Sequence, residues 1–394
     1  MPNVFDYLEW RGDLTFEQAP LNEVDNLIFC LLSYVDLDGI VPPDPRQGRV
    51  PVRRAAAEYF FTHPEMPTRP LGLIVPADIL TVFRRMAHTK RFKDLELTGY
   101  VNEVSEERGM QFSALTVRLP GEQLFVAFRG TDDTIVGWRE DFNMCHMDEV
   151  PSQRMAAEYL NRLDMTPDTA LYVGGHSKGG NLAVWGAVHA EEGVRRHMAA
   201  VYSHDGPGFS EGTVQSDAYR TLSDRIHILL PDDSLVGLLL EHDEEYAIVK
   251  SNRKGLFQHD GLSWEVLGGR FRRADTLSPR GIHTDTVIRD HIQGMTKEER
   301  RDLIEIIFNL LESTGAKTLT ELRQGGTKAI ITMIRTFREL SAEEQETAVY
   351  LWDKLFGGRT GEGGDEKRRK EPERKPPKRG KGKTRISFFP LLLP

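Results

Sequence analysis

The amino-acid sequence predicts an α/β fold, in which a mostly parallel β-sheet is flanked by helices. Short, continuously apolar runs occur at 124–128, 170–173, 199–203 and 226–230. Such runs are typical of strands that are buried on both faces of a parallel sheet. A helical pattern at 155–163 separates two of them, as expected where helices alternate with strands. The third observation is a strand, turn and helix pattern that begins in the second run.

That pattern occupies residues 171–184, which read Leu-Tyr-Val-Gly-Gly-His-Ser-Lys-Gly-Gly-Asn-Leu-Ala-Val. Its apolar start, its Gly-x-Ser-x-Gly centre and its apolar end predict a nucleophile elbow. The turn forces the serine into strained backbone geometry, so the residues around it must be small. Gly175 and Gly179 meet that need. We therefore predict that Ser177 is the nucleophile of an α/β-hydrolase-type enzyme.

Residues 1–95 are predicted to form a mostly helical N-terminal region. Asn22 or Asp25 can cap a helix that runs through apolar residues to Leu32. A second helix is predicted at 79–85. Proline-containing segments between the two break the helical pattern and predict loops.

Residues 96–284 are predicted to form the α/β-hydrolase core, and residues 285–357 a small helical C-terminal region. In the C-terminal region, two capping boxes begin at Thr296 and Ser341, each with a glutamate three residues later. A further helix is predicted between them at 329–337. This region is predicted to be a small helical domain or a cap.

Residues 358–394 are predicted to be a disordered basic tail, because glycine, proline and charged residues leave almost nothing to bury. Within it, 359–385 hold twelve Lys or Arg and five Asp or Glu, whereas the whole chain has a formal net charge of −9. The tail ends in an apolar tip at 388–393. A basic stretch beside an apolar tip is a two-signal pattern of peripheral membrane attachment. Membrane contact and a solvated linker both stay open.

The composition is that of an ordinary soluble protein, with 39% hydrophobic and 28% charged residues. No apolar run is long enough to span a membrane, and the first residues do not form a signal peptide. Cys30 and Cys145 form neither a metal-binding spacing nor a disulfide framework, which fits a reducing cytoplasm. The acidic body disfavours nucleic-acid binding through phosphate contacts. We therefore expect a cytoplasmic protein without a nucleic-acid partner.

A serine nucleophile needs a histidine base and an acid that orients it. In this fold class the acid precedes the histidine, and both follow the serine. Asp232 and Asp233 follow the apolar run at 226–230. Acids at that end of a strand lie on the same sheet edge as the elbow. Asp233 is therefore the predicted acid, with Asp232 as the alternative.

The base must be chosen from twelve histidines. His176 adjoins the serine but is expected to point elsewhere on the strained turn. His204 and His227 lie in or beside predicted strands and are expected to be core residues. His259 lies on a predicted loop that follows the acid, so it is the predicted base.

The oxyanion hole is predicted to combine two donors. One is the backbone N–H of Lys178. The other is Thr131, whose backbone N–H and hydroxyl follow the strand at 124–128. The Lys178 side chain is predicted to be solvated, because the chain has no Gly-x-x-x-x-Gly-Lys-Ser/Thr pattern that would bind phosphate.

This chemistry needs no metal ion and no organic cofactor, and the sequence predicts neither. Asp285, Asp290, His283 and His291 have side chains that can bind metals. They lie in a predicted helical stretch without a recognised ligand spacing, so a metal site is not expected there.

Four short motifs stand in order along the chain. They are Phe-Arg-Gly-Thr at 128–131 with Trp138 and Asp141 beyond it, Gly-His-Ser-Lys-Gly-Gly at 175–180, Asp-Gly-Pro-Gly at 205–208, and His-Asp-Gly at 259–261 with Trp264 beyond it. Over residues about 100–270 they resemble the oxyanion motif, the elbow, the Gly-x-Pro segment and the His-x-Gly segment of class 3 lipases. This resemblance implies a lipase-like fold and the roles predicted above for Ser177, His259 and Thr131.

The chain also resembles a bacterial lipase-like family of unknown physiological role. The segments that carry this resemblance are 3–13, 22–27 and 175–184, and it extends to about residue 357. The basic tail is expected to be an addition of this protein.

One departure from class 3 lipases concerns the acid. Those enzymes place it in an Asp-x-Val-Pro context, whereas Ser-Leu-Val-Gly follows Asp233. The acid therefore stays open among Asp233, Asp232 and the more distant Glu241.

These residues together predict a serine hydrolase that cleaves carboxylic esters, of lipids or of small acyl groups, through an acyl-enzyme intermediate. A thioesterase or an amidase would use the same residues, so both stay open as alternatives. A catalytically silent scaffold that binds lipid or protein is the third alternative. The complete set of candidate catalytic residues counts against it.

Overall fold

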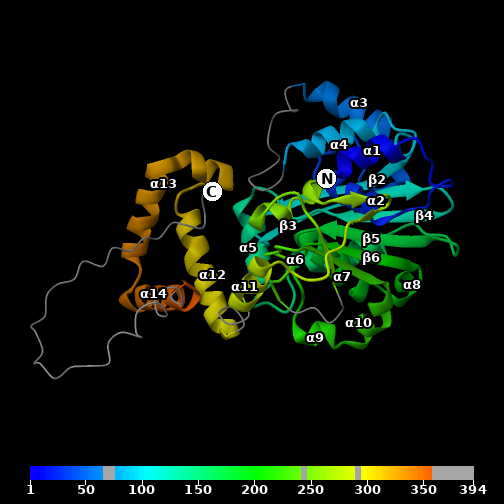
Figure 1. Ribbon diagram of the computed structural model, residues 1–394. Helices are drawn as coiled ribbons and strands as arrows, with labels where there is room; N and C mark the ends of the chain where they lie inside the picture. Colours follow the sequence, from blue (N-terminus) through cyan, green and yellow to red (C-terminus); the bar gives the residue numbers. More distant parts are fainter. Residues whose placement is uncertain (65–75, 241–245, 289–293, 357–394) are drawn as a thin grey trace, which may run out of the picture.

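A computed structural model describes residues 1–64, 76–240, 246–288 and 294–356 of the chain. Its centre is an eight-stranded sheet whose spatial order β1 to β8 follows the order in the sequence (Figure 1). The strands are β1 (Val50–Pro51), β2 (Glu96–Ser105), β3 (Met110–Leu119), β4 (Gln123–Phe128), β5 (Ala170–His176), β6 (Met198–His204), β7 (Ile226–Pro231) and β8 (Ala247–Val249). Strands β1 to β4 pair antiparallel, and β4 to β8 pair parallel.

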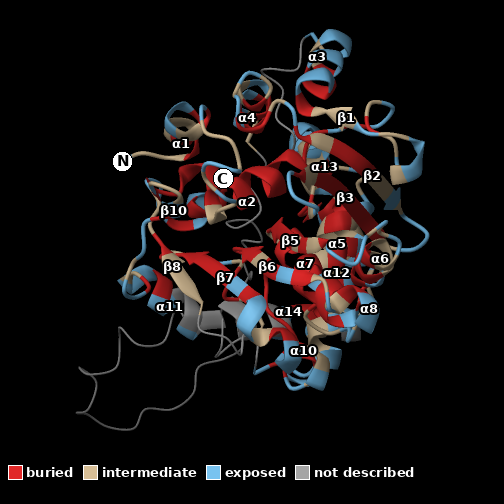
Figure 2. Ribbon diagram, turned by 90° about the vertical axis from the view of Figure 1, so that its right-hand side faces the viewer, coloured by how far each residue is buried: buried red, intermediate tan, exposed pale blue. Residues whose placement is uncertain are grey.

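The parallel strands are buried on both faces, as their continuous apolar runs predict. In β4, Phe125 and Ala127 join one hydrophobic core, and Leu124, Val126 and Phe128 join the other. Alternate side chains point to opposite faces of a strand, so one short apolar segment stabilises both layers. Figure 2 shows that the strands of this sheet are largely buried and that the exposed residues lie mainly on the outer helices and loops. The predicted α/β fold, a mostly parallel sheet with flanking helices, is therefore confirmed.

Four N-terminal helices cover one face of the sheet: α1 (Val4–Arg11), α2 (Glu23–Leu32), α3 (Val52–Thr62) and α4 (Asp78–Met86). Asn22, rather than Asp25, caps α2, since its side chain accepts from the N–H of Val24 at 3.0 Å and of Asp25 at 3.2 Å. A buried ion pair between Asp25 and Arg91 ties this helix to the chain before β2.

The other face is covered by α6 (Pro151–Asn161), α7 (Lys178–His189) and α10 (Asp217–Leu222). Two short helices, α8 (Glu192–Arg195) and α9 (Glu211–Val214), lie in the connections on this side. The helix α5 (Ile135–Asn143) follows β4 and lies at the end of the sheet where the elbow is found.

The C-terminal helices are α11 (Pro279–Ile288), α12 (Lys297–Glu312), α13 (Leu319–Glu339) and α14 (Ala342–Phe356). Helix α11 crosses the boundary predicted at 284. Both predicted capping boxes form, at Thr296 and at Ser341. The predicted helix at 329–337 is part of α13, which has a non-helical residue at Gly326.

Helices α12 and α13 pack on α5 through a separate apolar cluster. Ile135 of α5 joins Phe308 and Leu311 of α12 and Leu319 and Met333 of α13 in that cluster. The backbone N–H of Ile135 also donates to the Lys317 carbonyl at 2.9 Å.

No helix within the described ranges has the length and apolarity that crossing a membrane would need. The predicted tail at 358–394 lies outside these ranges.

Candidate active site

Ser177 stands between β5 and α7 with φ 59° and ψ −134°, a backbone conformation that L-residues rarely adopt. The turn is tight on both sides of the serine. A Cβ on Gly175 would lie 1.9 Å from the Gly179 carbonyl oxygen, and one on Gly179 would lie 2.1 Å from the Phe128 carbonyl oxygen. Larger residues cannot fit at either glycine without moving the backbone. The strand, sharp turn and helix predicted from the sequence are therefore present.

Ser177 and Asp205 directly follow two neighbouring parallel strands. His176, the last residue of β5, pairs with His204, the last residue of β6. The Ser177 N–H donates to the His204 carbonyl at 2.9 Å, and the Asp205 N–H donates to the Leu229 carbonyl at 2.8 Å. Parallel pairing thus brings these two side chains to the same sheet edge.

His259 binds Asp205 at this edge. Its Nδ1 lies 2.7 Å from Asp205 Oδ2, and both side chains are buried. The other carboxylate oxygen, Oδ1, accepts from the Ser234 hydroxyl at 2.5 Å and from the Gly237 N–H at 3.2 Å. Because a carboxylate only accepts, Nδ1 carries the imidazole proton in this contact. The second ring nitrogen, Nε2, is then left as a base.

His176 fixes the backbone of His259 beside the elbow. Its Nε2 donates to the His259 carbonyl at 2.6 Å, and its Nδ1 lies 3.2 Å from the Tyr34 hydroxyl. The rings of His176 and His259 are 4.7 Å apart between centroids. Burial, and then the nearby imidazole of His259, lower the pKa of His176 to about 3, so the His176 imidazole is neutral. His176, the residue before Ser177, thereby connects the elbow to the backbone of His259.

The predictions of Asp233 and Asp232 as the acid are wrong. Asp233 Oδ2 accepts from the Gly255 N–H at 3.0 Å, and its Oδ1 accepts from the Ser278 hydroxyl. Asp232 pairs with Lys250 at 2.8 Å. Both acids follow β7, whereas the acid that reaches His259 follows β6, the strand beside β5. Glu241 lies outside the described residues.

The sequence patterns did not predict Asp205, the residue whose carboxylate contacts His259. It stands directly after an apolar run, at the start of the Asp-Gly-Pro-Gly motif. Sequence reasoning used that motif only for its Gly-x-Pro part. Recognising Asp205 requires knowing that the apolar run before it forms β6, the strand that pairs with the elbow strand β5.

The segment after β4 lies against the elbow, as predicted for an oxyanion hole. A Cβ on Gly130 would lie 2.5 Å from the His176 carbonyl oxygen and 3.0 Å from Ser177 Cβ. The next residue, Thr131, donates its hydroxyl to Asp141 Oδ2. Lys178 begins α7, where a backbone N–H has no acceptor within the helix.

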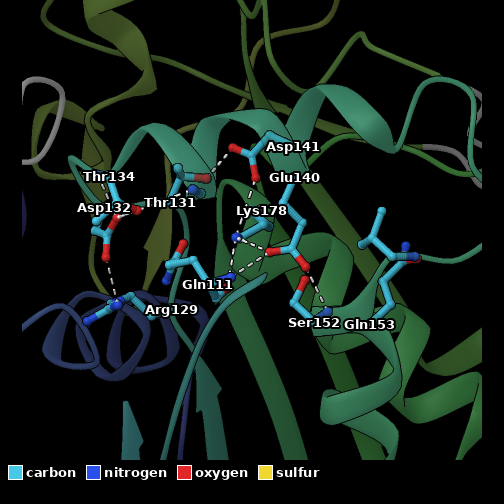
Figure 3. Close-up of polar contacts among 12 residues, drawn as sticks. Gln111, Arg129, Thr131, Asp132, Thr134, Glu140, Asp141, Ser152, Gln153 and Lys178 are labelled. Atoms are coloured by element: carbon cyan, nitrogen blue, oxygen red, sulfur yellow. Dashed lines mark hydrogen bonds and ion pairs between the residues drawn. The ribbon is translucent and has the colours of Figure 1, made fainter. Parts of the chain in front are cut away.

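The side chain of Lys178 is not solvated, which corrects the prediction. It is 1% exposed, and its ammonium group donates to the Gln111 carbonyl at 2.9 Å and to Glu140 Oε2 at 3.1 Å (Figure 3). Asp141 Oδ1 lies 3.5 Å from the same nitrogen. Burial disfavours the ammonium form, but Glu140 and Asp141 outweigh this effect and raise the pKa of Lys178. No local sequence pattern indicates these partners, because they lie on other elements.

Of the two histidines expected in the core, only His204 is buried. His227, the second residue of β7, is exposed, which corrects its predicted core position. His204 is fully buried and its Nε2 lies 2.8 Å from Asn26 Oδ1. His227 contacts Tyr202 through its ring. Across the described ranges, no three His, Cys, Asp or Glu side chains are grouped so that they could hold a metal ion. Asp290 and His291 of the metal alternative lie outside those ranges.

The chain is similar to one protein family and to a solved lipase structure. One similar solved structure is described as "Crystal structure of M37 lipase", with 17% identity and a TM-score of 0.35 over 55% of this chain and 70% of that one. Comparison with curated proteins gave no match. The Mbeg1-like family matches residues 86–309, a range that contains Ser177, Asp205 and His259. Since this match spans more than half of the chain, the protein belongs to the Mbeg1-like family.

Proposed function

We propose that this protein is a lipase-like serine hydrolase that cleaves carboxylic esters through an acyl-enzyme intermediate. The observation that carries the proposal is the 2.7 Å contact between His259 and Asp205 beside the strained turn of Ser177. A serine on such a turn, with a histidine that a buried carboxylate orients, is the arrangement that acyl transfer requires. Ser177, His259 and Asp205 are the proposed nucleophile, base and acid.

In the proposed reaction, Ser177 Oγ attacks the ester carbonyl and His259 Nε2 accepts the hydroxyl proton. Asp205 stabilises the imidazolium that forms and keeps the ring in place. The histidine then gives the proton to the departing alcohol. A water molecule, deprotonated by the same nitrogen, releases the acyl group from Ser177.

The tetrahedral intermediates carry a negative oxygen, which needs preorganised donors. The backbone N–H groups of Lys178 and Thr131 are the proposed donors, because the elbow and the segment after β4 approach each other there. Donors that are fixed before the reaction stabilise the developing charge without reorganisation. Each such donor is worth about 10²- to 10³-fold in kcat.

Lipids and small acyl esters are the proposed substrates. Thioesters and amides react through the same residues, so the leaving group is decided by measurement. A silent lipid- or protein-binding scaffold needs no strained serine and no oriented histidine, and the presence of both counts against it.

A fluorophosphonate probe tests the proposal directly, since it reacts with an activated serine. The wild-type protein should be labelled at Ser177, and it should hydrolyse p-nitrophenyl butyrate. Ser177→Ala should abolish both signals while the fold is retained. A panel of matched esters, thioesters and amides then assigns the leaving group. A wild-type protein that is neither labelled nor active would contradict the proposal.

A further inference from the structure

The ammonium group of Lys178 joins three elements next to the elbow (Figure 3). Its own residue begins α7, the Gln111 carbonyl lies on β3, and Glu140 and Asp141 lie on α5. Glu140 is fully buried and also accepts from the Gln111 N–H at 3.0 Å and from the Ser152 N–H of α6 at 2.8 Å. The three protons of the ammonium group therefore face one carbonyl and two carboxylates.

Resting on the function proposed above, we infer that Lys178 is a positioning residue for the oxyanion hole. Its ammonium group holds the Asp141 carboxylate, Asp141 holds the Thr131 hydroxyl, and this chain of contacts fixes where the Thr131 N–H points. Lys178 thus offers one proposed oxyanion donor through its backbone and anchors the other through its side chain.

The contact between Thr131 and Asp141 can fix a backbone group because threonine is branched at Cβ. Its hydroxyl is three bonds from the backbone nitrogen, and the branch restricts rotation about the Cα–Cβ bond, so the bond to Asp141 also limits how the backbone can turn. Residues 130–133 form neither a helix nor a strand, so no regular backbone pairing holds Thr131 itself, although its neighbours Arg129 and Thr134 pair with Ser113 and Thr318. The side-chain anchor is therefore the contact that sets its orientation.

The pKa of Asp141 depends on the charge of Lys178, because the carboxylates of Asp141 and Glu140 both lie beside its ammonium group. Burial raises the pKa of Asp141 to about 6, the Lys178 charge opposes this rise, and the Glu140 charge adds to it. Without Lys178, Asp141 would hold its proton at neutral pH. A neutral Asp141 is a weaker acceptor for the Thr131 hydroxyl than a carboxylate, because bonds to ionised groups are stronger.

Two other titratable groups that interact with Asp141, Tyr34 and Cys145, do not change charge between pH 5 and 8. Tyr34, from the segment after α2, has a pKa that burial raises. Cys145, from the turn after α5, has a pKa that burial raises to about 11. Lys178 from α7 and Glu140 from α5 are the charged groups that act most strongly on Asp141. Changes at these two positions should therefore move its titration in opposite directions.

The test compares the pH dependence of kcat for p-nitrophenyl butyrate between pH 5 and 8. Lys178→Met should lower kcat at neutral pH by about 10-fold or more, with little change in KM, because one donor is misplaced. It should also move the acidic limb of the profile upwards by about 1 pH unit. Glu140→Gln should move that limb downwards, since it removes a like charge.

The double variant Glu140→Gln with Lys178→Met removes both buried charges together and guards against misfolding of the lysine variant alone. Its acidic limb should lie above that of Glu140→Gln. Lys328→Met, the same substitution at an exposed lysine of α13, should give the wild-type profile. Thermal unfolding and fluorophosphonate labelling show that each variant is folded and that Ser177 is still reactive.

Identical acidic limbs in the wild type, Glu140→Gln and the double variant would overturn the inference. They would mean that His259 alone sets the limb and that Lys178 only stabilises the fold. This outcome would leave the proposed function intact, because turnover and labelling would persist. A wild-type protein with neither ester turnover nor fluorophosphonate labelling would instead overturn the proposed function, and this inference with it.

Discussion

His259 Nδ1 lies 2.7 Å from Asp205 Oδ2. Asp205 directly follows β6, and His259 ends the 3₁₀ turn that comes after β8. Asp205 is fully buried, and three donors hold its carboxylate: His259, Ser234 and Gly237. An acceptor with this many fixed donors can hold the imidazole in a single tautomer. The same contact decides between Asp205 and Asp233 as the residue whose loss should stop the reaction.

The first prediction compares these two aspartates. Asp205→Asn keeps the shape of the side chain but allows the wrong imidazole tautomer, and we expect kcat to fall by about 10⁴-fold. Asp233→Asn is the matched control and should keep most of the activity, since Asp233 binds Gly255 and Ser278 rather than His259. Steady-state hydrolysis of p-nitrophenyl butyrate measures both. An inactive Asp233→Asn beside an active Asp205→Asn would reverse the assignment.

The two aspartates show where sequence reasoning succeeds and where it stops. The elbow was predictable because all its requirements are local: an apolar strand, small residues around Ser177 and a helix after it. Choosing the acid requires knowing which strand lies next to β5. That neighbour is set by pairing between β5 and β6, which are separated by a whole helix, and no local pattern reports it.

Lys178 illustrates the same limit for electrostatics. A lysine after a nucleophile is normally expected in solvent, because burying an unpaired charge is costly. Here Glu140 and Asp141 compensate the charge, but they lie almost forty residues earlier on another helix. Their closeness depends on how α5 packs against α7. The parallel sheet and the capped helices were predictable, because apolar periodicity and capping residues are local signals.

The second prediction concerns the backbone strain at Ser177. Ser177→Gly and Ser177→Ala should both be inactive, since both lack the hydroxyl. At φ 59° and ψ −134° glycine is unstrained but alanine is not, and such strain costs about 1–3 kcal/mol. Ser177→Gly should therefore unfold at a higher denaturant concentration than Ser177→Ala. Equal midpoints would mean that the turn relaxes without strain when the serine is absent.

The third prediction concerns stability at acidic pH. Burial lowers the pKa of His204 to about 3, so His204 stays neutral in the folded protein where it would be protonated in the unfolded chain. The unfolded state then binds more protons below about pH 6.5, and stability is lost as the pH falls. His204→Gln removes this effect. We expect the stability advantage of the wild type over His204→Gln to be smaller at pH 5 than at pH 7.

Urea unfolding at the two pH values measures that advantage. One such group changes the free energy of unfolding by up to about 2 kcal/mol between pH 7 and 5. Carboxyl groups with raised pKa values act in the opposite direction, but they are shared by both proteins and cancel in the comparison. An advantage that is constant, or larger at pH 5, would contradict a neutral buried His204.

The fourth prediction concerns the basic tail, which we propose as a site of peripheral membrane contact. Deletion of 359–394 should leave hydrolysis of soluble esters unchanged, because none of the proposed catalytic residues lies there. Full-length protein should sediment with vesicles that contain anionic lipid at low salt and be released at high salt, since salt screens the attraction. Equal sedimentation of the truncated protein would exclude the tail as the contact.

The fifth prediction concerns the C-terminal helices and their hold on α5. Phe308 of α12 is 2% exposed and packs on Phe142 of α5, with ring centroids 5.6 Å apart. Phe308→Ala should destabilise the protein by about 3–5 kcal/mol through the cavity it leaves. Since α5 carries Asp141, looser packing there should also lower kcat at a temperature where the variant is still folded.

Ile331→Ala on α13 is the control for that variant, because its side chain is 61% exposed and buries little surface. It should change neither stability nor kcat. Circular dichroism should establish the folded range of each variant before the rates are compared. If Phe308→Ala loses stability but keeps the wild-type kcat while folded, the C-terminal helices stabilise α5 without influencing the oxyanion segment. If the folded variant instead has a lower kcat, the C-terminal helices also help to hold α5 and the oxyanion segment in position.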